Sequence, residues 1–179
     1  MKKLKIVIVI IVGVILFFIM GNFLVIPSSM EYTNADVQYG MLAFAAAVYG
    51  PVAGFVIGFL GDYISSDYNE VFIWWSWVIA SGIFGLLVGI GCRGMEIDKG
   101  KFGKKEALRF NIVQITAHIL SWGIVAPLLD IFMYDQPVQT VFRQGFVAAL
   151  SNIVITLIFG NLLCVACSDI TFSKDILSE

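Results

Sequence analysis

Charged residues are scarce in this chain. Only 13% of its 179 residues are charged, 59% are hydrophobic, and the mean hydropathy is +0.92. A soluble domain carries about twice this share of charged residues, so the low charge excludes a soluble globular protein. We therefore predict an integral membrane protein. At about 20 residues per helical crossing, the chain has room for about five to seven spans.

Motifs for nucleotide binding and catalysis are absent as well. The sequence contains no G-x-x-x-x-G-K-[ST], which excludes a P-loop ATP site, and no H-E-x-x-H, serine elbow or paired carboxylates. The segment GIGCRG at 89–94 matches G-x-G-x-x-G, but it ends a membrane helix instead of following a strand. We therefore expect no enzyme, no cofactor and no nucleic-acid partner. Energy for uphill transport would come from elsewhere.

Histidine and cysteine are also few. His118 is the only histidine, and the cysteines are Cys92, Cys164 and Cys167. The three thiols fall on the same predicted inner side without a fourth ligand, so we expect small packing residues and no metal site. A lone histidine without a second histidine or a buried carboxylate in register argues against proton coupling.

Long apolar runs, by contrast, are plentiful. Runs of spanning length cover 6–26, 72–92, 108–129 and 141–167. The first follows MKKLK and resembles a secretory signal, but it is too long and no small-x-small cleavage pattern follows it. We interpret it as a retained helix. The stretch 37–66 is either one long helix or two short ones.

The distribution of basic residues decides between one helix and two. Nine of the eleven Lys and Arg residues precede the first helix or lie in the loop after 92: Lys2, Lys3, Lys5, Arg93, Lys99, Lys101, Lys104, Lys105 and Arg109. Cytoplasmic segments collect Lys and Arg, so both segments should be inside, which requires an even number of crossings between them. A break at Gly50-Pro51 provides it, since proline disfavours helix at the preceding residue.

We therefore predict an all-α protein of six transmembrane helices, with both termini cytoplasmic and residues 1–179 forming a single domain. The helices are expected at about 6–26, 36–49, 51–66, 72–92, 108–129 and 141–167. Glycines recur every four residues at 50, 54 and 58, and again at 85 and 89. Such small-residue stripes let helices approach closely in a membrane, so we expect packing seams there.

Polar and aromatic side chains gather toward the outer side of this topology. Three of the four tryptophans fall at 74, 75 and 77, and a single face of the fifth helix carries Asn111, Gln114, His118 and Trp122. We predict an outward-open small-molecule pocket. Its candidate residues are Asn34, Gln38, Tyr39, Trp74, Trp77, His118, Trp122, Arg143, Gln144 and Asn152.

Several of these polar and aromatic residues also have a structural interpretation. Asn111 and Gln114 could form hydrogen bonds between helices, His118 could be a packing residue, and Arg143 could extend from a helix end toward the interface. The tryptophans could form an interfacial belt. We expect at least one ring, Trp77 or Trp74, to face the ligand and the others to anchor the helix.

The sequence resembles a known family over nearly its whole length. The most specific blocks are WWSWVIASG at 74–82 and APLLDI at 126–131 followed by VFRQG at 141–145; FVIGFLGD at 55–62, FNIVQ at 110–114, Gln38-Tyr39 and Asn152 add to them. These blocks are similar to the riboflavin-type S components of energy-coupling factor (ECF) transporters. Asp62 departs from the family pattern, which has a histidine after the glycine.

The resemblance implies a membrane subunit that binds a vitamin or vitamin precursor from outside the cell. It also implies two kinds of partner, a transmembrane coupling protein and two cytoplasmic ATPases, which would use ATP. Such proteins often meet the coupling protein through a small-residue face of the first helix. Here the first helix offers only Gly13 and Gly21, so Ala46 and Gly54 of the next two helices are candidates as well. The alternative left open by the residues is a stand-alone facilitator or channel for a small polar solute.

Overall fold

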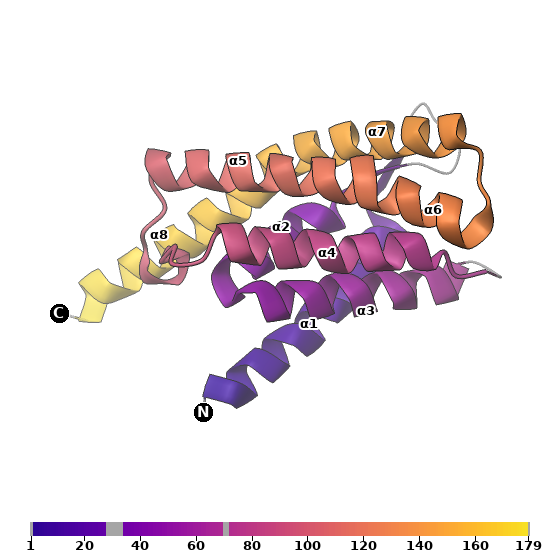
Figure 1. Ribbon diagram of the computed structural model, residues 1–179. Helices are drawn as coiled ribbons and strands as arrows, with labels where there is room; N and C mark the ends of the chain where they lie inside the picture. Colours follow the sequence, from indigo (N-terminus) through magenta and orange to yellow (C-terminus); the bar gives the residue numbers. More distant parts are fainter. Residues whose placement is uncertain (1, 28–33, 70–71, 179) are drawn as a thin grey trace.

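The computed structural model describes residues 2–27, 34–69 and 72–178. Over these residues the long helices form six continuous segments, as the sequence predicts, and the connection between the fourth and the fifth contains a short 3-10 helix, η1 (Ile97–Lys99) (Figure 1). The first four are α1 (Lys2–Phe23), α2 (Gln38–Tyr49), α3 (Pro51–Asn69) and α4 (Trp75–Gly91). The fifth runs through α5 (Lys104–Leu120), η2 (Ser121–Val125) and α6 (Ala126–Tyr134), and the sixth through α7 (Val138–Ile155), η3 (Thr156–Gly160) and α8 (Asn161–Ser178).

The break between α2 and α3 lies at Gly50-Pro51, which confirms the prediction. Gly50 has φ 91° and ψ 179°, a conformation that glycine adopts without strain, and its N–H still donates to the Ala46 carbonyl at the end of α2. Pro51 then occupies the first position of α3, where its missing N–H costs no helical hydrogen bond.

The last two helical segments each contain a wider, π-helical turn, which the sequence did not predict. The turn η2 ends at Val125, two residues before Pro127, which is the second residue of α6. A proline inside a helix removes one hydrogen bond and crowds the preceding turn, and a π turn accommodates that misfit without ending the helix. The segment can therefore bend while it remains continuous.

The all-α class is confirmed, but the prediction that the first helix reaches residue 26 was wrong. Helix α1 ends at Phe23, and the strands β1 (Val25–Pro27) and β2 (Asn34–Asp36) form an antiparallel pair. The register joins Val25 to Asp36 and Pro27 to Asn34. Pro27 keeps Ile26 out of the helix, because the residue before a proline avoids helical geometry.

Lipid-facing character is clearest in three helical segments. Leu4–Phe23, Lys104–Tyr134 and Val138–Thr171 are long and apolar enough to cross a membrane, while Pro51–Ser66 and Trp75–Gly91 are shorter apolar helices. Large apolar side chains such as Ile119, Phe146 and Ile158 are exposed on the outside of the bundle. Helix α2 instead lies inside, with most of its residues buried. The protein is therefore a multi-pass membrane protein.

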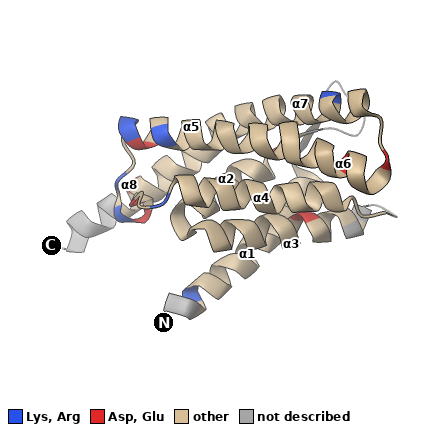
Figure 2. Cartoon of the chain, in the orientation of Figure 1, with Lys and Arg blue, Asp and Glu red and all other residues tan. Residues whose placement is uncertain are grey.

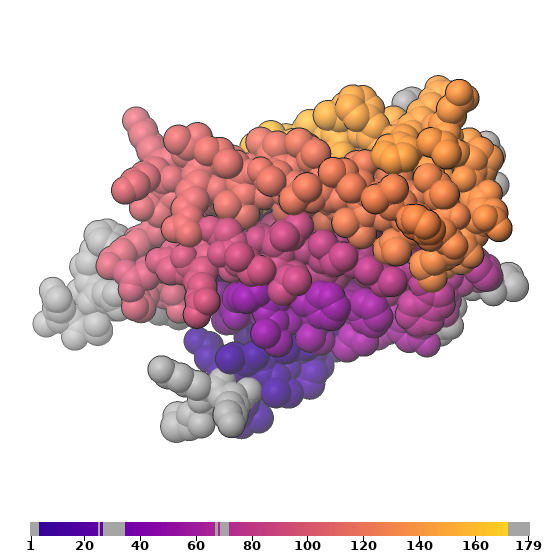
Figure 3. Space-filling view, viewed as in Figure 1, coloured from indigo at the N-terminus to yellow at the C-terminus, as the bar shows by residue number. Residues whose placement is uncertain are grey.

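The predicted glycine seam lies between α3 and α4. A Cβ atom on Gly85 would collide with the backbone of Gly54, and one on Gly58 would collide with the Ser81 carbonyl. The two helices thus pack backbone to backbone where lipid provides no hydrophobic drive for association. In the space-filling view they form the lower part of the main body, from which the start of α1 projects (Figure 3).

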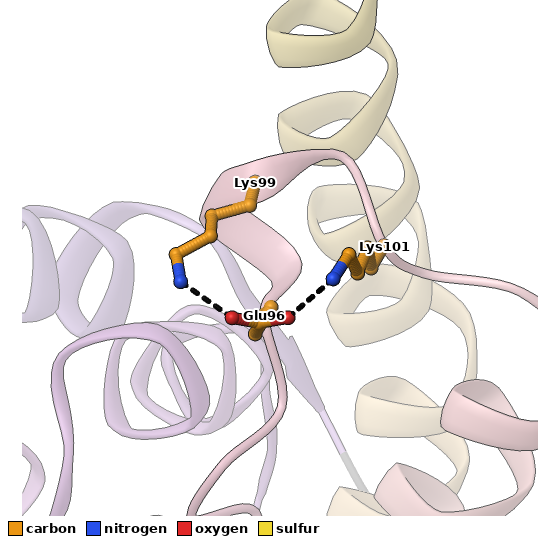
Figure 4. Close-up of polar contacts among 3 residues, drawn as sticks. All are labelled: Glu96, Lys99 and Lys101. Atoms are coloured by element: carbon orange, nitrogen blue, oxygen red, sulfur yellow. Dashed lines mark hydrogen bonds and ion pairs between the residues drawn. The ribbon is translucent and has the colours of Figure 1, made fainter.

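Charge is distributed unevenly along the bundle. Lysine and arginine gather at the end that carries the connection between α4 and α5, whereas the other end carries mainly acidic residues (Figure 2). In the basic connection the Glu96 carboxylate accepts hydrogen bonds from Lys99 and, at 2.5 Å, from Lys101 (Figure 4). These contacts hold the pKa of Glu96 at about 2. The start of α1 and the end of α8 point toward this same end (Figure 1).

Candidate functional site

A cavity of about 550 Å³ opens at the acidic end of the bundle. Four helices and one connection contribute to its wall: α3 with Asp62 and Ser66, the start of α4 with Trp74 and Trp77, α6 with Asp130, the following connection with Gln136, and α7 with Thr140, Val141 and Gln144. The volume lies within the range of small-molecule sites, about 300–1,000 Å³. Its wall combines two indole rings with hydrogen-bonding groups.

Asp130 joins two sides of this cavity. Its carboxylate accepts a hydrogen bond from the Ser76 hydroxyl through Oδ1 and from the Trp77 indole N–H, at 3.2 Å, through Oδ2. The residue is only 4% exposed. Since both donors are neutral, the contacts fix the carboxylate and the Trp77 ring in place without cancelling the charge.

Asp62 is the second carboxylate in the wall, and it is connected to the core below. The Ser81 hydroxyl donates to Asp62 Oδ2 at 2.8 Å, and the Tyr39 hydroxyl lies 2.9 Å from Ser81 Oγ. Because Ser81 uses its only proton toward Asp62, Tyr39 donates to Ser81. Desolvation and the neighbouring Asp62 carboxylate raise the pKa of Asp36, in β2, to about 7.

The tryptophan cluster divides between the two predicted roles. Trp74 and Trp77 line the cavity, and their rings are held by Tyr134 at 4.7 Å and by Trp122 at 5.1 Å between ring centroids. Trp75 is 39% exposed and stacks on Tyr63 outside the cavity. Trp75 is therefore the ring in position for the interfacial role.

Three of the predicted ligand residues, Trp74, Trp77 and Gln144, line the cavity. Another three lie beneath them as a buried layer: the Tyr39 ring centroid is 5.2 Å from that of Trp122 and 6.1 Å from that of His118. These three side chains support the cavity floor but are not part of its wall.

Of the other four predicted ligand residues, three lie apart from the wall. Asn152 accepts a hydrogen bond from the Asp36 backbone N–H at 2.9 Å, Gln38 is buried against Gly21, and Arg143 is exposed on α7. The side chain of Asn34 is outside the described residues. A ligand-binding role for these residues stays a prediction.

Two polar residues of the fifth helix, Asn111 and His118, have hydrogen-bond partners on other helices. The Asn161 side chain donates to Asn111 Oδ1 at 2.6 Å, linking α8 to α5. His118 stacks on Phe84 at 4.1 Å, and its Nε2 lies 3.1 Å from Thr156 Oγ1. Gln114 is fully buried, and neither of its side-chain polar atoms has a hydrogen-bond partner among the described residues.

The residues proposed for the coupling-protein surface all pack within the chain. Gly13 faces Ile57, Gly21 faces Gln38, and Gly54 packs against Ala46 and Gly85. Ala46 itself is fully buried. Their role in docking a partner stays a prediction.

Six wall residues were not among the sequence candidates for ligand binding. One is Asp62, which was noted only for its departure from the family pattern, and the other five were missed. They are Ser66, Asp130, Gln136, Thr140 and Val141. Asp130 stands inside the APLLDI block, so the block itself was the available signal. The contact that matters joins Asp130 to Ser76, 54 residues away, and sequence spacing does not reveal it.

Comparison with the sequences of known proteins places this chain in a family. The sequence model of the "ECF-type riboflavin transporter, S component" matches residues 1–168. A UPF0397 protein of Lactococcus lactis subsp. cremoris (strain NZ9000) is 41% identical over 162 residues, which is 90% of this chain and 89% of the relative. One from Enterococcus faecalis (strain ATCC 700802 / V583) is 40% identical over 177 residues, 99% of this chain and 97% of the relative. No solved structure matches the chain.

The fold and the cavity define a class: helical, multi-pass membrane proteins hollowed at one end of the bundle. Within that class, the chain belongs to the family of ECF-type riboflavin transporter S components. This confirms the resemblance in the WWSWVIASG and APLLDI blocks. Membership supports a substrate-binding role in transport, and the family is not one of enzymes.

Proposed function

We propose that this protein is the S component of an ECF-type importer that captures a vitamin or vitamin precursor from outside the cell. The observation that carries the proposal is the cavity of about 550 Å³ with Trp74 and Trp77 in its wall, in a chain of this family. Indole rings make good walls for a flat ligand. Ser66, Gln136, Thr140 and Gln144 provide hydrogen bonds to fix its orientation.

The proposed orientation follows from charge. Lysine and arginine concentrate at the end opposite the cavity, and cytoplasmic segments collect these residues. The cavity would then face outward in the cell membrane, with six spans in one domain and both termini inside. Three segments are long and apolar enough to cross a membrane, which supports this arrangement: Leu4–Phe23, Lys104–Tyr134 and Val138–Thr171.

The proposed partners are a transmembrane coupling protein and two cytoplasmic ATPases. This chain contains no P-loop motif, so ATP would be used by the ATPases and not by this subunit. The family name supports such a division of labour. A stand-alone facilitator would need no such partners.

Transport and binding measured separately test the proposal. Cells that produce this chain with the coupling protein and ATPases should accumulate the compound that copurifies with it, as identified by mass spectrometry. Cells that produce the chain alone should bind it but not accumulate it. Undiminished uptake by the chain alone would favour a facilitator. Absence of any bound small molecule, with no binding of vitamins at micromolar concentration, would contradict the proposal.

A further inference from the structure

The charge of the cavity wall is one-sided. Among the described residues, the lining contains two carboxylates, Asp62 and Asp130, and no lysine, arginine or histidine. Arg143, the basic residue on α7, is exposed and outside the lining. A ligand in this cavity therefore meets negative charge and neutral donors or acceptors, and no positive charge from the lining.

The carboxylate of Asp130 is nearly inaccessible to bulk solvent. It is 4% exposed, and its carboxylate accepts hydrogen bonds from the neutral Ser76 hydroxyl and Trp77 N–H. A carboxylate has about four acceptor sites, so capacity remains for a donor on the ligand. A desolvated charge is costly unless it is paired, and in a low-dielectric cavity attraction to a cation is much stronger than in water.

The aromatic wall favours the same kind of ligand. Trp77 presents its ring beside Asp130, and Trp74 lies in the same wall. The face of an indole ring attracts a positively charged group within about 6 Å of its centroid. Carboxylates and indole faces together select a cation, whereas an anion would be repelled by both.

We infer that the ligand is a vitamin-sized ring compound that carries a positively charged nitrogen, bound between the indole walls with its charge toward Asp62 and Asp130. This inference rests on the proposed function and narrows it to one substrate class. Neutral side chains such as Gln144 then fix the remaining heteroatoms of the ring.

Binding to the purified full-length protein in detergent tests the charge preference. The probes are thiamine, riboflavin and biotin, which are cationic, neutral and anionic at neutral pH, together with the copurifying compound identified by mass spectrometry. The bound compound should be a cation, and biotin should not compete with it. A neutral or anionic compound that binds tightest would overturn the inference and leave the S-component function intact. No binding by any compound would overturn the proposed function as well.

Replacing one carboxylate at a time shows how much each contributes to the affinity for the cationic ligand. For the cationic ligand, Asp130→Asn and Asp62→Asn should each raise Kd by at least about tenfold, because each loses a charge in a low-dielectric site. The matched control is Asp135→Asn: Asp135 is exposed, outside the lining, and has φ 50°, which asparagine tolerates. It should change Kd by less than about twofold.

A neutral isostere of the bound cation shows whether the cavity is still formed in each variant. It should bind more weakly than the cation to the wild type and about equally well to wild type, Asp62→Asn and Asp130→Asn. Parallel losses for the neutral and the cationic compound in both variants would show a merely structural role and would overturn the inference.

Discussion

Asp36 holds a proton at a pH at which an ordinary carboxyl group is ionised. Desolvation and the nearby Asp62 carboxylate raise its pKa to about 7. Its backbone N–H donates to Asn152, which keeps the residue at the junction of β2 and α7. Asp36 therefore makes the stability of this end of the bundle depend on pH.

The sign of that dependence follows from the raised pKa. The folded state binds the proton more tightly than the unfolded chain, so the stabilisation is present at low pH and is lost as pH rises through about 7. From pH 6 to pH 8 the free energy of unfolding should fall by about 1 kcal/mol from this group. Unfolding in detergent at both pH values measures it. Asp36→Asn should remove this part of the fall, and a variant that retains the full fall would contradict the assignment.

Individual residues show how far sequence reasoning reaches. At least one of Trp74 and Trp77 was predicted to face the ligand, because aromatic residues so close together at a membrane interface are conspicuous. Both line the cavity, and their contact with a ligand stays a prediction. Asp130 was missed because its neighbours come from a different helix. Arg143 was predicted from its position at a helix start, but its orientation on α7 depends on packing that the sequence does not specify.

At the scale of elements, the seam between α3 and α4 positions two sides of the cavity. Asp62 stands on α3 and Trp77 on α4, and the backbones approach most closely at Gly54 and Gly85. Glycine spacing predicted this seam, since small residues allow close approach. The π turn η2 and the β1–β2 pair were not predictable in the same way, because η2 depends on local accommodation of Pro127 and the strand pair on contacts between separate segments.

Gly85→Ala should destabilise the fold by about 1–3 kcal/mol, because the new methyl group would meet the Gly54 backbone and force the helices apart. Unfolding of the detergent-solubilised protein measures the loss. Gly123→Ala is the matched control, since its Cβ would have only Ile119 Cγ2 nearby, at 3.9 Å. It should change the stability by less than about 1 kcal/mol. Equal stability of the two variants would show that the seam is not tightly packed.

At the scale of the whole molecule, the cluster of lysine and arginine residues and the cavity lie at opposite ends of the bundle. The start of α1 and the end of α8 point toward the end that carries the basic connection between α4 and α5 (Figures 1 and 2). The residues that line the cavity lie at the other end. The number of helical segments followed from counting basic residues across the Gly50-Pro51 break. The proposed orientation in the membrane, with the cavity outside, rests on the distribution of lysine and arginine alone.

Labelling of single cysteines tests this orientation. With the native cysteines replaced by alanine, Asp135→Cys should react with a membrane-impermeant maleimide in intact cells, because Asp135 is exposed at the cavity end. Lys101→Cys, exposed in the basic connection, should react only after the membrane is permeabilised. The reverse pattern would invert the topology and place the cavity inside.

The central claim is that the cavity walled by Trp77 binds the transported compound, and the affinity of two single variants tests it most directly. Trp77→Ala should raise Kd for the copurifying ligand by at least about tenfold, or about 1.4 kcal/mol, because it removes both a wall and the donor to Asp130. Trp75→Ala, from the ring that stacks outside the cavity, should leave Kd within about twofold. Trp77→Phe and gel filtration of each variant check that the protein is folded. Wild-type affinity in a folded Trp77→Ala protein would contradict the account.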